Sequence, residues 1–509
     1  MAILEIALII FIIVVVLSSA IGFYIHNKDD NKMINLRRIN MTVTRFAPSP
    51  TGYLHIGGLR TALYSYLWAR KNGGVFRLRI EDTDLARNSD DALKAIIEAF
   101  DWVGLSYDGE VEYQSKRTQI YKEYINKLLE NGNAYKCYMS KDELDALRAS
   151  QEAAKQTPRY DETWRPEDGK ILPAIPENVE PVIRIKAPKT GEIRFLDGVK
   201  GDMKFDASFV DDFVIARSNG MPTYNFVVTI DDMLMEMTDV IRGDDHLSNT
   251  PKQIVIYNAL GVKHPNFYHV PMINNPEGKK LSKRDGAMDV MDYKRLGYLP
   301  EALLNFLVRL GWSNKDQEIF SMKEMLELFD PKNINKSASA YNAEKLIWLN
   351  SEYIKARTND KLVEELKFFD LDLTNYSKKE EILNLSKQRA NTLVELKKSI
   401  LDIKDAPKEF EEAGVKKFVK EDTNSILKEY LELLEKNKSS FSSPSELENI
   451  TKPFIEAKGL KFPQLFQPIR IALTGGTQAP SVYDILFILD FAESNERISK
   501  ALEKSFKNS

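Results

Sequence analysis

Residues 42–73 place a short apolar strand, a turn with two prolines and three glycines, and an amphipathic helix directly after one another. The helix is predicted to end at the Lys-Asn-Gly sequence of residues 71–73, and its apolar side chains recur at helical spacing at Leu59, Leu63, Tyr66 and Leu67. A second strand is predicted over residues 75–80, and a second helix near Asn88, with Asp91 in the capping-box position. Because strands that alternate with helices need crossover connections, this order predicts a parallel sheet.

The alternation gives way to a different pattern after a helix that is predicted to end near residues 129–132. Six prolines fall between residues 158 and 188, together with short strand-like runs such as residues 182–186, which indicates an inserted domain. The sheet pattern is predicted to resume over residues 224–230 and 239–242, and helices are predicted over residues 251–260 and 300–310.

Beyond about residue 350, almost every segment has helical periodicity. The clearest helix start is the sequence Ser-Pro-Ser-Glu at residues 443–446, which combines an N-cap serine, a proline at the first helical position and a capping-box glutamate. A separate α-helical C-terminal domain is therefore predicted. The length of 509 residues by itself favours about three domains.

The composition limits the classes of partner and of site. The formal charge of -4 excludes a generally basic surface, so a nucleic acid would have to bind local groups of Lys and Arg. The single cysteine, Cys137, excludes an internal disulfide and is typical of a reducing compartment. Five histidines in the whole chain argue against a multi-histidine metal site.

Two distant segments carry a resemblance to a known family. The turn at residues 48–58 and the basic loop Lys-Leu-Ser-Lys-Arg at residues 280–284 resemble the HIGH element and the KMSKS loop of class I aminoacyl-tRNA synthetases. From Met41 to its end, the chain resembles a bacterial-type glutamyl-tRNA synthetase. Six motifs carry this resemblance in order, at residues 45–52, 79–84, 222–226, 240–246, 280–284 and 472–475.

The resemblance implies an α/β Rossmann-like class I catalytic domain with an inserted α+β connective domain, followed by an all-α anticodon-binding domain. The expected parts are a hydrophobic N-terminal extension at residues 1–40, the catalytic domain at 41–115 and 223–279, the inserted acceptor-binding domain at 116–222, the KMSKS-type loop with a stem-contact region at 280–349, and the anticodon-binding domain at 350–509. The inserted domain is expected to grip the acceptor end of tRNA.

His55 lies where the turn becomes a helix, so its imidazole and the nearby backbone N–H groups can meet the phosphates of ATP. An isolated histidine there would more often pack locally, and a basic turn is usually only solvated. Lys283 is expected to stabilise the transition state, because attack on the α-phosphate gathers negative charge. The predicted catalytic residues are His55 and Lys283, and the resemblance implies ATP binding by Thr51, His55, Gly57, Gly58, Lys280, Ser282 and Lys283.

Glutamate brings a second carboxylate, which a partly desolvated pocket recognises best with a guanidinium group. The resemblance implies that Arg45 and Arg242 contact the substrate carboxylates, that Glu81 accepts from the α-ammonium, and that further contacts come from Ala47, Ser49 and Tyr224. Taken singly, these residues also fit ion-paired arginines at strand ends and a core tyrosine. Glutamine would leave a buried arginine without its anion, so no editing site is needed.

The implied reaction is in-line attack of the glutamate α-carboxylate on ATP, which gives glutamyl-adenylate and pyrophosphate, and then transfer to a hydroxyl of the terminal adenosine of tRNA(Glu). Positioning and electrostatics suffice for this chemistry without a protein nucleophile. Two alternatives stay open. One is a paralogue that charges tRNA(Gln) with glutamate for later amidation, and the other is a non-catalytic, membrane-tethered protein that binds tRNA.

Paired aspartates at residues 231–232 and 244–245 suggest two interpretations. They could help to hold Mg²⁺ that enters with ATP, or they could cap loops and position neighbouring basic side chains, and we favour the second. Several bacterial members of the family carry a zinc site of closely spaced cysteines near residue 137. Since the Cys-Tyr-Met sequence at residues 137–139 lacks the ligands that tetrahedral zinc requires, no structural zinc and no resident metal are predicted.

Residues 6–25 contain no charge and would cross about 30 Å of hydrocarbon as a helix. Four basic residues follow by position 38, so a membrane anchor would leave the rest of the chain in the cytoplasm. The other interpretation is that translation starts at Met33 or Met41. We favour it because tRNA charging needs no membrane. We expect a cytoplasmic monomer, tethered to the inner membrane only if residues 1–40 are present.

Overall fold

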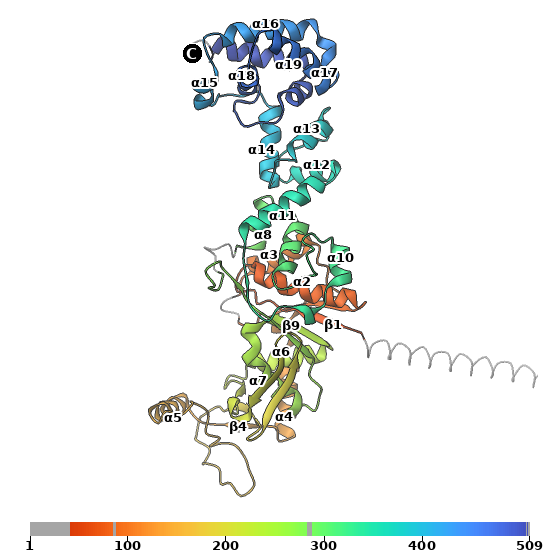
Figure 1. Ribbon diagram of the computed structural model, residues 1–509. Helices are drawn as coiled ribbons and strands as arrows, with labels where there is room; N and C mark the ends of the chain where they lie inside the picture. Colours follow the sequence, from red (N-terminus) through yellow and green to blue (C-terminus); the bar gives the residue numbers. More distant parts are fainter. Residues whose placement is uncertain (1–40, 85–87, 282–287, 505, 507–509) are drawn as a thin grey trace, which may run out of the picture. The chain divides into compact units, whose positions relative to one another are not determined.

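The computed structural model describes residues 41–84, 88–281, 288–504 and 506, and the chain forms two compact units (Figure 1). The first unit contains the chain up to Val290 together with Leu307–Tyr341, and the second contains Met291–Phe306 and Asn342–Ser509. Among the helices that the structure describes, none combines the length and the apolar character needed to cross a membrane. The predicted span at residues 6–25 lies outside the described residues.

The first unit begins with the predicted parallel sheet. Strands β1 (Val43–Phe46), β2 (Val75–Ile80) and β3 (Glu112–Tyr113) pair in parallel in that order. Helix α2 (Ile56–Lys71) connects the first two strands, and α3 (Asp90–Val103) follows the second. The expected cap of α3 is wrong by one residue. Ser89 accepts the backbone N–H of Ala92, whereas Asn88 donates instead to the carbonyl of Asp82.

A second sheet in the same unit has the strand order β7-β6-β10-β9. Strands β6 (Glu192–Asp197), β10 (Asn266–Val270) and β9 (Asp239–Gly243) run parallel, and β7 (Gly201–Asp206) runs antiparallel to β6. The backbone N–H of Thr238 donates to the carbonyl of Val43 at 3.0 Å, so the two sheets adjoin along β9 and β1. Part of the segment predicted as an insertion thus continues the sheet that contains β9.

Residues 224–230, expected as a strand, belong to helix α6 (Tyr224–Leu234). Phe226, Val227 and Ile230 are buried. The hydroxyl of Thr229 donates a hydrogen bond to the carbonyl of Asn225 four residues earlier, as threonine side chains within helices do. The strand expectation is wrong because this run is apolar on nearly every face, and a short apolar run fits a buried helix as well as a buried strand. Helix α7 (Thr250–Ala259) confirms the helix that was predicted over residues 251–260.

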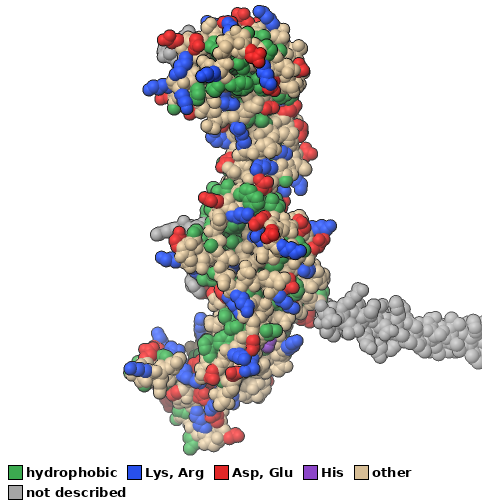
Figure 2. Space-filling model, viewed as in Figure 1, with side chains coloured by type: hydrophobic (Ala, Val, Ile, Leu, Met, Phe, Trp, Pro, Cys, Tyr) green, Lys and Arg blue, Asp and Glu red, His purple; other side chains and the backbone are tan. Residues whose placement is uncertain are grey.

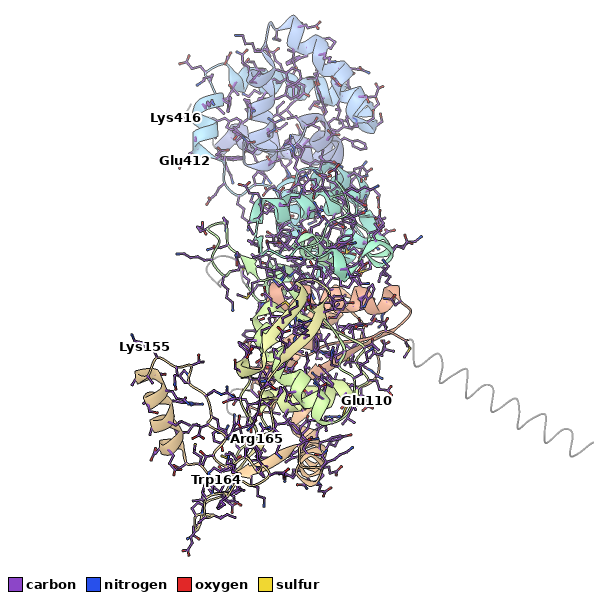
Figure 3. All side chains as sticks on the ribbon, turned by 60° about the horizontal axis from the view of Figure 1, so that its bottom comes forward. Glu110, Lys155, Trp164, Arg165, Glu412 and Lys416 are labelled. Carbon is purple, nitrogen blue, oxygen red and sulfur yellow. The ribbon has the colours of Figure 1, made fainter. Side chains whose placement is uncertain are left out.

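The rest of the first unit includes an antiparallel sheet and several short elements. Strands β4 (Ala134–Cys137), β5 (Val182–Ile185) and β8 (Val214–Ala216) form that sheet. Helix α5 (Lys141–Ala153) buries none of its residues, and Figure 3 labels Lys155 just after its end and Arg165 in the loop beyond. The remaining elements are α4 (Thr118–Glu130), α10 (Met322–Leu328), β11 (Ile273–Asn274), β12 (Ser339–Ala340), and the 3-10 helices η1 (Gln114–Arg117), η2 (Ala207–Phe209), η3 (Asp244–Asn249) and η5 (Pro331–Asn333).

The second unit is helical, as the sequence predicts, around a core of buried leucines and isoleucines. Ser443 caps α17 by accepting the backbone N–H of Glu446 at 3.2 Å, although within this described helix Glu446 returns no bond to the N–H of Ser443. Two helices, α8 (Val290–Arg295) and α9 (Pro300–Arg309), span points where the chain passes between units. The others are α11 (Ala343–Ala356), α12 (Asn359–Lys367), α13 (Lys379–Ser386), α14 (Leu393–Lys404), α15 (Glu412–Phe418), α16 (Thr423–Lys436), η6 (Lys438–Ser442), α17 (Pro444–Ala457), α18 (Phe462–Thr474) and α19 (Val482–Lys504).

Candidate active site

His55 caps helix α2 at the predicted phosphate-binding turn. Its Nδ1 accepts the backbone N–H of Gly58 at 3.2 Å, so the proton of the neutral imidazole lies on Nε2. Desolvation by the surrounding protein and the positive charge of Lys280 lower the pKa of His55 below its ordinary value, although Asp245 opposes the shift. His55 therefore presents a neutral donor at the positive end of the helix dipole.

The described ends of the basic loop adjoin this turn. On one side, Lys280 forms an antiparallel bridge with Asn274, and Leu281 donates its N–H to Ile273 at 3.1 Å. On the other side, Asp289 bridges to His55, and the next residue donates its N–H to the carbonyl of Leu54 at 2.9 Å. The two distant motifs are thus brought together at the start of α2. Ser282 and Lys283 themselves lie outside the described residues.

Arg45 at the end of β1 and Arg79 on β2 share one buried carboxylate. Asp232 accepts from Nε of Arg45 at 3.1 Å and from Nη1 of Arg79 at 2.6 Å, and a second bond from Nη2 of Arg45 makes that pair bidentate. Arg79 also donates to Glu81 at 3.3 Å. Asp231 accepts from Gln114, Arg117 and Tyr121. The aspartates at 231–232 therefore position basic side chains, as we expected.

Arg242 on β9 differs from Arg45, because its guanidinium has neutral partners. Nη2 donates to Oγ1 of Thr250 at 2.8 Å, and Nε donates to Nε2 of His269 at 3.2 Å. Its exposed fraction is only 6%, and its Nη1 is buried with no hydrogen-bond partner among the residues that the structure describes. Within the same described part of the chain, no carboxylate forms an ion pair with Arg242. A buried cation in this state can accept an anionic ligand.

Four of the predicted glutamate-binding residues lie close enough together for their charges to act on one another. Burial and the negative charge of Glu81 raise the pKa of the Tyr224 hydroxyl, whereas Arg242 and Arg45 lower it. Burial also raises the pKa of Glu81, against the opposing effect of its arginine neighbours. The Tyr224 hydroxyl lies 3.0 Å from Nδ1 of His246. The structure thus gathers Arg45, Glu81, Tyr224 and Arg242 in one polar cluster, with His246 beside them.

Ala47 and Ser49 occupy the segment that leads from β1 into the turn. Backbone bonds fasten this segment to the end of β2 and to the start of α3, since the N–H of Glu81 donates to Pro48 at 2.9 Å and the N–H of Ser89 donates to Pro50 at 3.0 Å. The segment therefore runs beside the backbone of Glu81. Thr51 follows it as an exposed residue at the start of the turn.

Two of the side chains that were considered as metal ligands have protein partners. Asp244 forms an ion pair with Lys200 at 2.9 Å, and the thiol of the buried Cys137 lies 3.5 Å from the hydroxyl of Tyr160. Across the described residues, no group of three His, Cys, Asp or Glu side chains is arranged to hold a metal ion.

Sequence reasoning did not single out Asp197, Thr250 or His269, although two of them contact Arg242 directly. None of the three lies in a recognised motif. The parallel pairing of β9 with β10 sets His269 opposite Arg242, and this register emerges only when the two strands are known to be neighbours.

Comparisons with known proteins show the family of the chain. Residues 41–348 match the family model described as tRNA synthetases class I (E and Q), catalytic domain, and residues 355–502 match a model described as an anticodon binding domain. Glutamate–tRNA ligase 1 of Aliarcobacter butzleri is 80% identical over 92% of this chain and 100% of its own length. Glutamate–tRNA ligase 2 of a Nitratiruptor species is 59% identical over 91% of this chain and 99% of its own length.

A solved structure supports the expected fold class as well. The crystal structure of a glutamate tRNA ligase from Elizabethkingia meningosepticum, in complex with its amino acid, matches with a TM-score of 0.82 at 34% identity and covers 91% of this chain and 100% of that one. The match extends over the catalytic and the helical regions and confirms the predicted class I synthetase architecture. The chain belongs to the glutamate–tRNA ligase family of class I aminoacyl-tRNA synthetases.

Proposed function

We propose that this protein attaches L-glutamate to tRNA(Glu) through a glutamyl-adenylate made from ATP. The observation that carries the proposal is the buried Arg242, whose Nη1 lacks a protein partner, in a cluster with Arg45, Glu81 and Tyr224. Such a cluster suits an amino acid that brings two carboxylates and one ammonium group. Membership of the glutamate–tRNA ligase family supports the same substrate.

In the first step, an oxygen of the glutamate α-carboxylate attacks the α-phosphorus of ATP, the bond from that phosphorus to the bridging oxygen breaks, and pyrophosphate leaves. Nε2–H of His55 and the start of α2 would stabilise the phosphate charge. Lys283 is proposed to meet the charge that develops in the transition state. In the second step, a hydroxyl of the terminal tRNA adenosine attacks the carbonyl carbon of the adenylate, and AMP leaves.

The remaining ATP contacts are proposed on the same basis. Mg²⁺ usually enters phosphoryl-transfer sites with the nucleotide and keeps phosphate oxygens as its main ligands, and we propose the same arrangement here. The bridge between Lys280 and Asn274 supports a phosphate contact for the loop, because it holds the start of the loop near His55. The proposed ATP contacts are Thr51, Gly57, Gly58, Lys280 and Ser282.

Glutamate is proposed to lie between the two arginines. Arg242 would receive the side-chain carboxylate, because its own protein partners leave its charge uncompensated. Arg45, although paired with Asp232, has a third nitrogen that makes no hydrogen bond within the described residues, and it would contact the α-carboxylate. Glu81 would accept from the α-ammonium, and Ala47, Ser49 and Tyr224 would complete the pocket.

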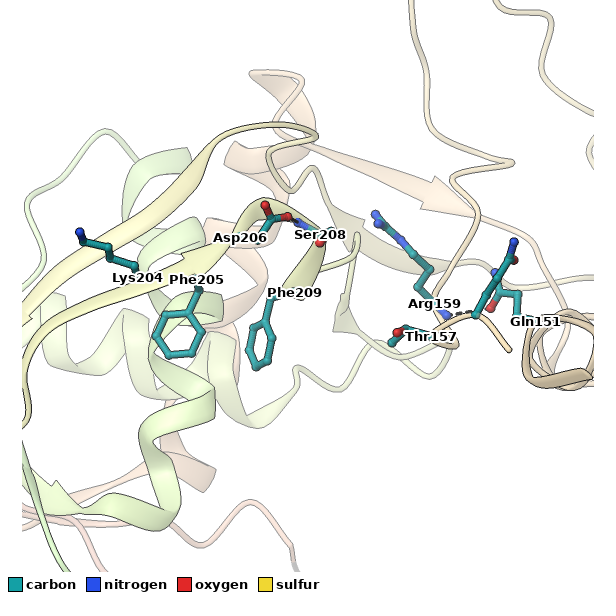
Figure 4. A pocket seen from close by; sticks show the side chains of 9 residues that line it. Gln151, Thr157, Arg159, Lys204, Phe205, Asp206, Ser208 and Phe209 are labelled. Carbon is teal, nitrogen blue, oxygen red and sulfur yellow. Dashed lines mark hydrogen bonds between the residues drawn. The ribbon is translucent and has the colours of Figure 1, made fainter. Parts of the chain in front are cut away.

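The inserted part of the first unit, residues 116–222, is proposed to hold the acceptor end of tRNA. A hollow of about 570 Å³ lies there, and Figure 4 shows Phe205 and Phe209 side by side at one end of it with Arg159 at the other. The two phenyl rings are 5.1 Å apart, and Phe209 is half exposed. Aromatic faces next to cations favour single-stranded nucleotides, because bases stack on the rings while phosphates approach the cations.

Aminoacylation with radiolabelled glutamate on purified tRNA(Glu) and tRNA(Gln), side by side, tests the proposed function. We expect charging of tRNA(Glu) that requires ATP and leaves glutamine unused. Charging of tRNA(Gln) in its place would identify the paralogue. Binding of tRNA without any charging or pyrophosphate exchange would contradict the proposal and would favour the non-catalytic alternative.

The oligomeric state and the cellular location of the enzyme are proposals as well. The enzyme is proposed to act as a monomer in the cytoplasm, with tRNA bound by both units. An inner-membrane tether would depend on residues 1–40. Fractionation of cells followed by N-terminal sequencing of the native protein would decide between the tether and the later start.

A further inference from the structure

Three neighbouring parallel strands of the first unit carry polar side chains in a row, at or next to their carboxyl ends. His269 on β10 pairs in register with Arg242 on β9, and Asp197 is the last residue of β6 on the other side of β10. Ligands of open α/β sheets bind beyond the carboxyl ends of their strands. The row therefore crosses the carboxyl end of the sheet, from Asp197 on β6 to Arg242 on β9, the strand that adjoins β1.

A chain of hydrogen bonds connects the row. Oδ2 of Asp197 lies 2.5 Å from Nδ1 of His269, and Nε2 of His269 accepts from Nε of Arg242 at 3.2 Å. The side chains of Asp197 and His269 are fully buried. One protonation state satisfies both bonds. The imidazole must be neutral, with its proton on Nδ1 toward the carboxylate and its lone pair on Nε2 toward the guanidinium.

The charges of the row agree with this assignment. Burial lowers the pKa of His269 and the charge of Arg242 adds to that effect, although the bond to Asp197 opposes it. Burial opposes ionisation of Asp197, yet the bonds from His269 and from the backbone N–H groups of Val199 and Lys200 keep its pKa below the usual value. The negative charge thus stays on Asp197, with a neutral ring between it and Arg242.

Arg45 provides the contrast within the same cluster. Its guanidinium is held bidentately by Asp232, so two of its donors are already bound to a carboxylate. Arg242 is held in place by a neutral imidazole and a hydroxyl, and its Nη1 stays without a hydrogen bond among the described residues. The row fixes the orientation of Arg242 without placing an anion against it.

We propose that Asp197 and His269 are positioning residues that orient Arg242 for the side-chain carboxylate of glutamate and leave its positive charge to that ligand. The proposal rests on the function proposed above. It assigns the preference for glutamate over glutamine to three buried residues on neighbouring strands, of which Arg242 alone touches the substrate.

Asp197→Asn tests the row with the smallest change of shape. The Oδ1 atom can still accept the backbone bonds of Val199 and Lys200, while an NH₂ group replaces the oxygen that faces His269. The amide donates to Nδ1, moves the imidazole proton to Nε2 and turns a second donor toward Arg242. We expect the KM for glutamate in tRNA charging to rise about 10- to 100-fold, the loss of one charge-assisted bond, with the KM for ATP unchanged.

Two substitutions of His269 distinguish the effect of its hydrogen bonds from the effect of the volume of its ring. His269→Gln keeps a donor for Asp197 and an acceptor for Arg242, so it should restore most of the glutamate affinity that His269→Leu loses. The matched control is His264→Leu, since His264 stacks on Phe267 at 5.7 Å and bonds only to the carbonyl of Pro265 among the described residues. The ratio of kcat/KM for glutamate to that for glutamine should fall in Asp197→Asn and His269→Leu and stay constant in His264→Leu.

An equal change in the KM for glutamate in Asp197→Asn and His264→Leu, or a ratio unchanged in both variants, would overturn the proposal. Should His269→Leu unfold, Asp197→Asn and His269→Gln still decide the matter, because both retain polar groups of similar size. Arg242→Gln tests the proposed substrate site separately from the role of the row. If it leaves the KM for glutamate unchanged, the proposed substrate site is wrong, whereas a loss in Arg242→Gln without one in Asp197→Asn removes only the role of the row.

Discussion

At the scale of single residues, the bond between His55 and Gly58 links the charge state of the imidazole to the start of α2. Protonation of Nδ1 would turn a donor toward the backbone N–H of Gly58 and abolish the cap. Because the pKa of His55 is lowered by desolvation and by Lys280, the unfolded chain binds this proton more tightly than the folded chain. The stability that the cap contributes is therefore complete above the ordinary histidine pKa and decreases as the pH falls through that value toward the lowered pKa of the folded state.

We predict that His55→Asn makes the thermal stability of the first unit less sensitive to acid. Asparagine is a good N-cap and does not titrate, so it keeps the bond from Gly58 at every pH. The melting temperature of wild type minus that of His55→Asn should fall as the pH is lowered from about 7.5 to 5, through the ordinary histidine pKa near 6.5. The difference isolates His55 from His246 and His269, whose pKa values are also lowered by burial. A difference independent of pH would contradict the assigned tautomer.

Asp232 holds two buried arginines, and its removal should destabilise the first unit. Asp232→Ala leaves Arg45 and Arg79 without their shared anion, a change that typically costs about 3 to 5 kcal/mol. Tryptophan fluorescence during urea unfolding can follow it, because four of the five tryptophans belong to this unit. Asp402→Ala, which breaks an exposed pair with Lys398 in the second unit, should leave that transition unchanged. Equal midpoints in the two variants would show that the shared carboxylate contributes little.

At the scale of elements, the first turn of α2 is closely fitted to the ring of His55. A Cβ atom added at Gly57 would lie 3.1 Å from two ring atoms, closer than ordinary van der Waals contact. The ring could make room only by moving away from the N–H of Gly58. Glycine at this position therefore keeps the place of the histidine ring, and it would also let a nucleotide approach as proposed above.

We predict that Gly57→Ala raises the KM for ATP several-fold while the helix becomes slightly more stable, because alanine is the better helix former by about 1 kcal/mol. In a His55→Ala background the same substitution has no ring to displace, so its effect on the KM should disappear. Pyrophosphate exchange in the presence of tRNA measures the KM for ATP in each background. Equal effects in the two backgrounds would show that Gly57 acts on the nucleotide directly.

Elements also differ in how far the sequence determines them. Strands β1 and β2 and helix α2 could be predicted because alternation, periodicity and the 71–73 stop signal all agree. Helix α6 could not, since Phe226, Val227 and Ile230 face the core from a short, mostly apolar run that fits a buried strand as well as a buried helix. The row from Asp197 to Arg242 could not be predicted from the sequence for another reason. It depends on which strands are neighbours, and local sequence does not encode the order of a sheet.

At the scale of the whole molecule, 71 basic and 75 acidic residues leave a formal charge of -4, and Figure 2 shows both signs interspersed over the face in view. A polyanion such as tRNA must then bind through local groups of Lys and Arg, and each phosphate contact releases a counterion. Glutamate would reach an arginine that is only 6% exposed, where added salt screens charges much less. The two substrates therefore meet very different electrostatic surroundings on one protein.

We predict that the KM for tRNA rises steeply, and that for glutamate only slightly, when monovalent salt is raised from about 50 to 200 mM. Both constants come from aminoacylation rates measured with the other substrates saturating. A double-logarithmic plot for tRNA should be linear, with a slope set by the number of phosphates that the protein neutralises, whereas the plot for glutamate should be nearly flat. A parallel rise of both constants would mean that glutamate binds at a solvated surface, and Arg242 could not then be its main contact. Potassium glutamate must be avoided as the salt, and a chloride series with an acetate series beside it separates general screening from anion competition at the arginine.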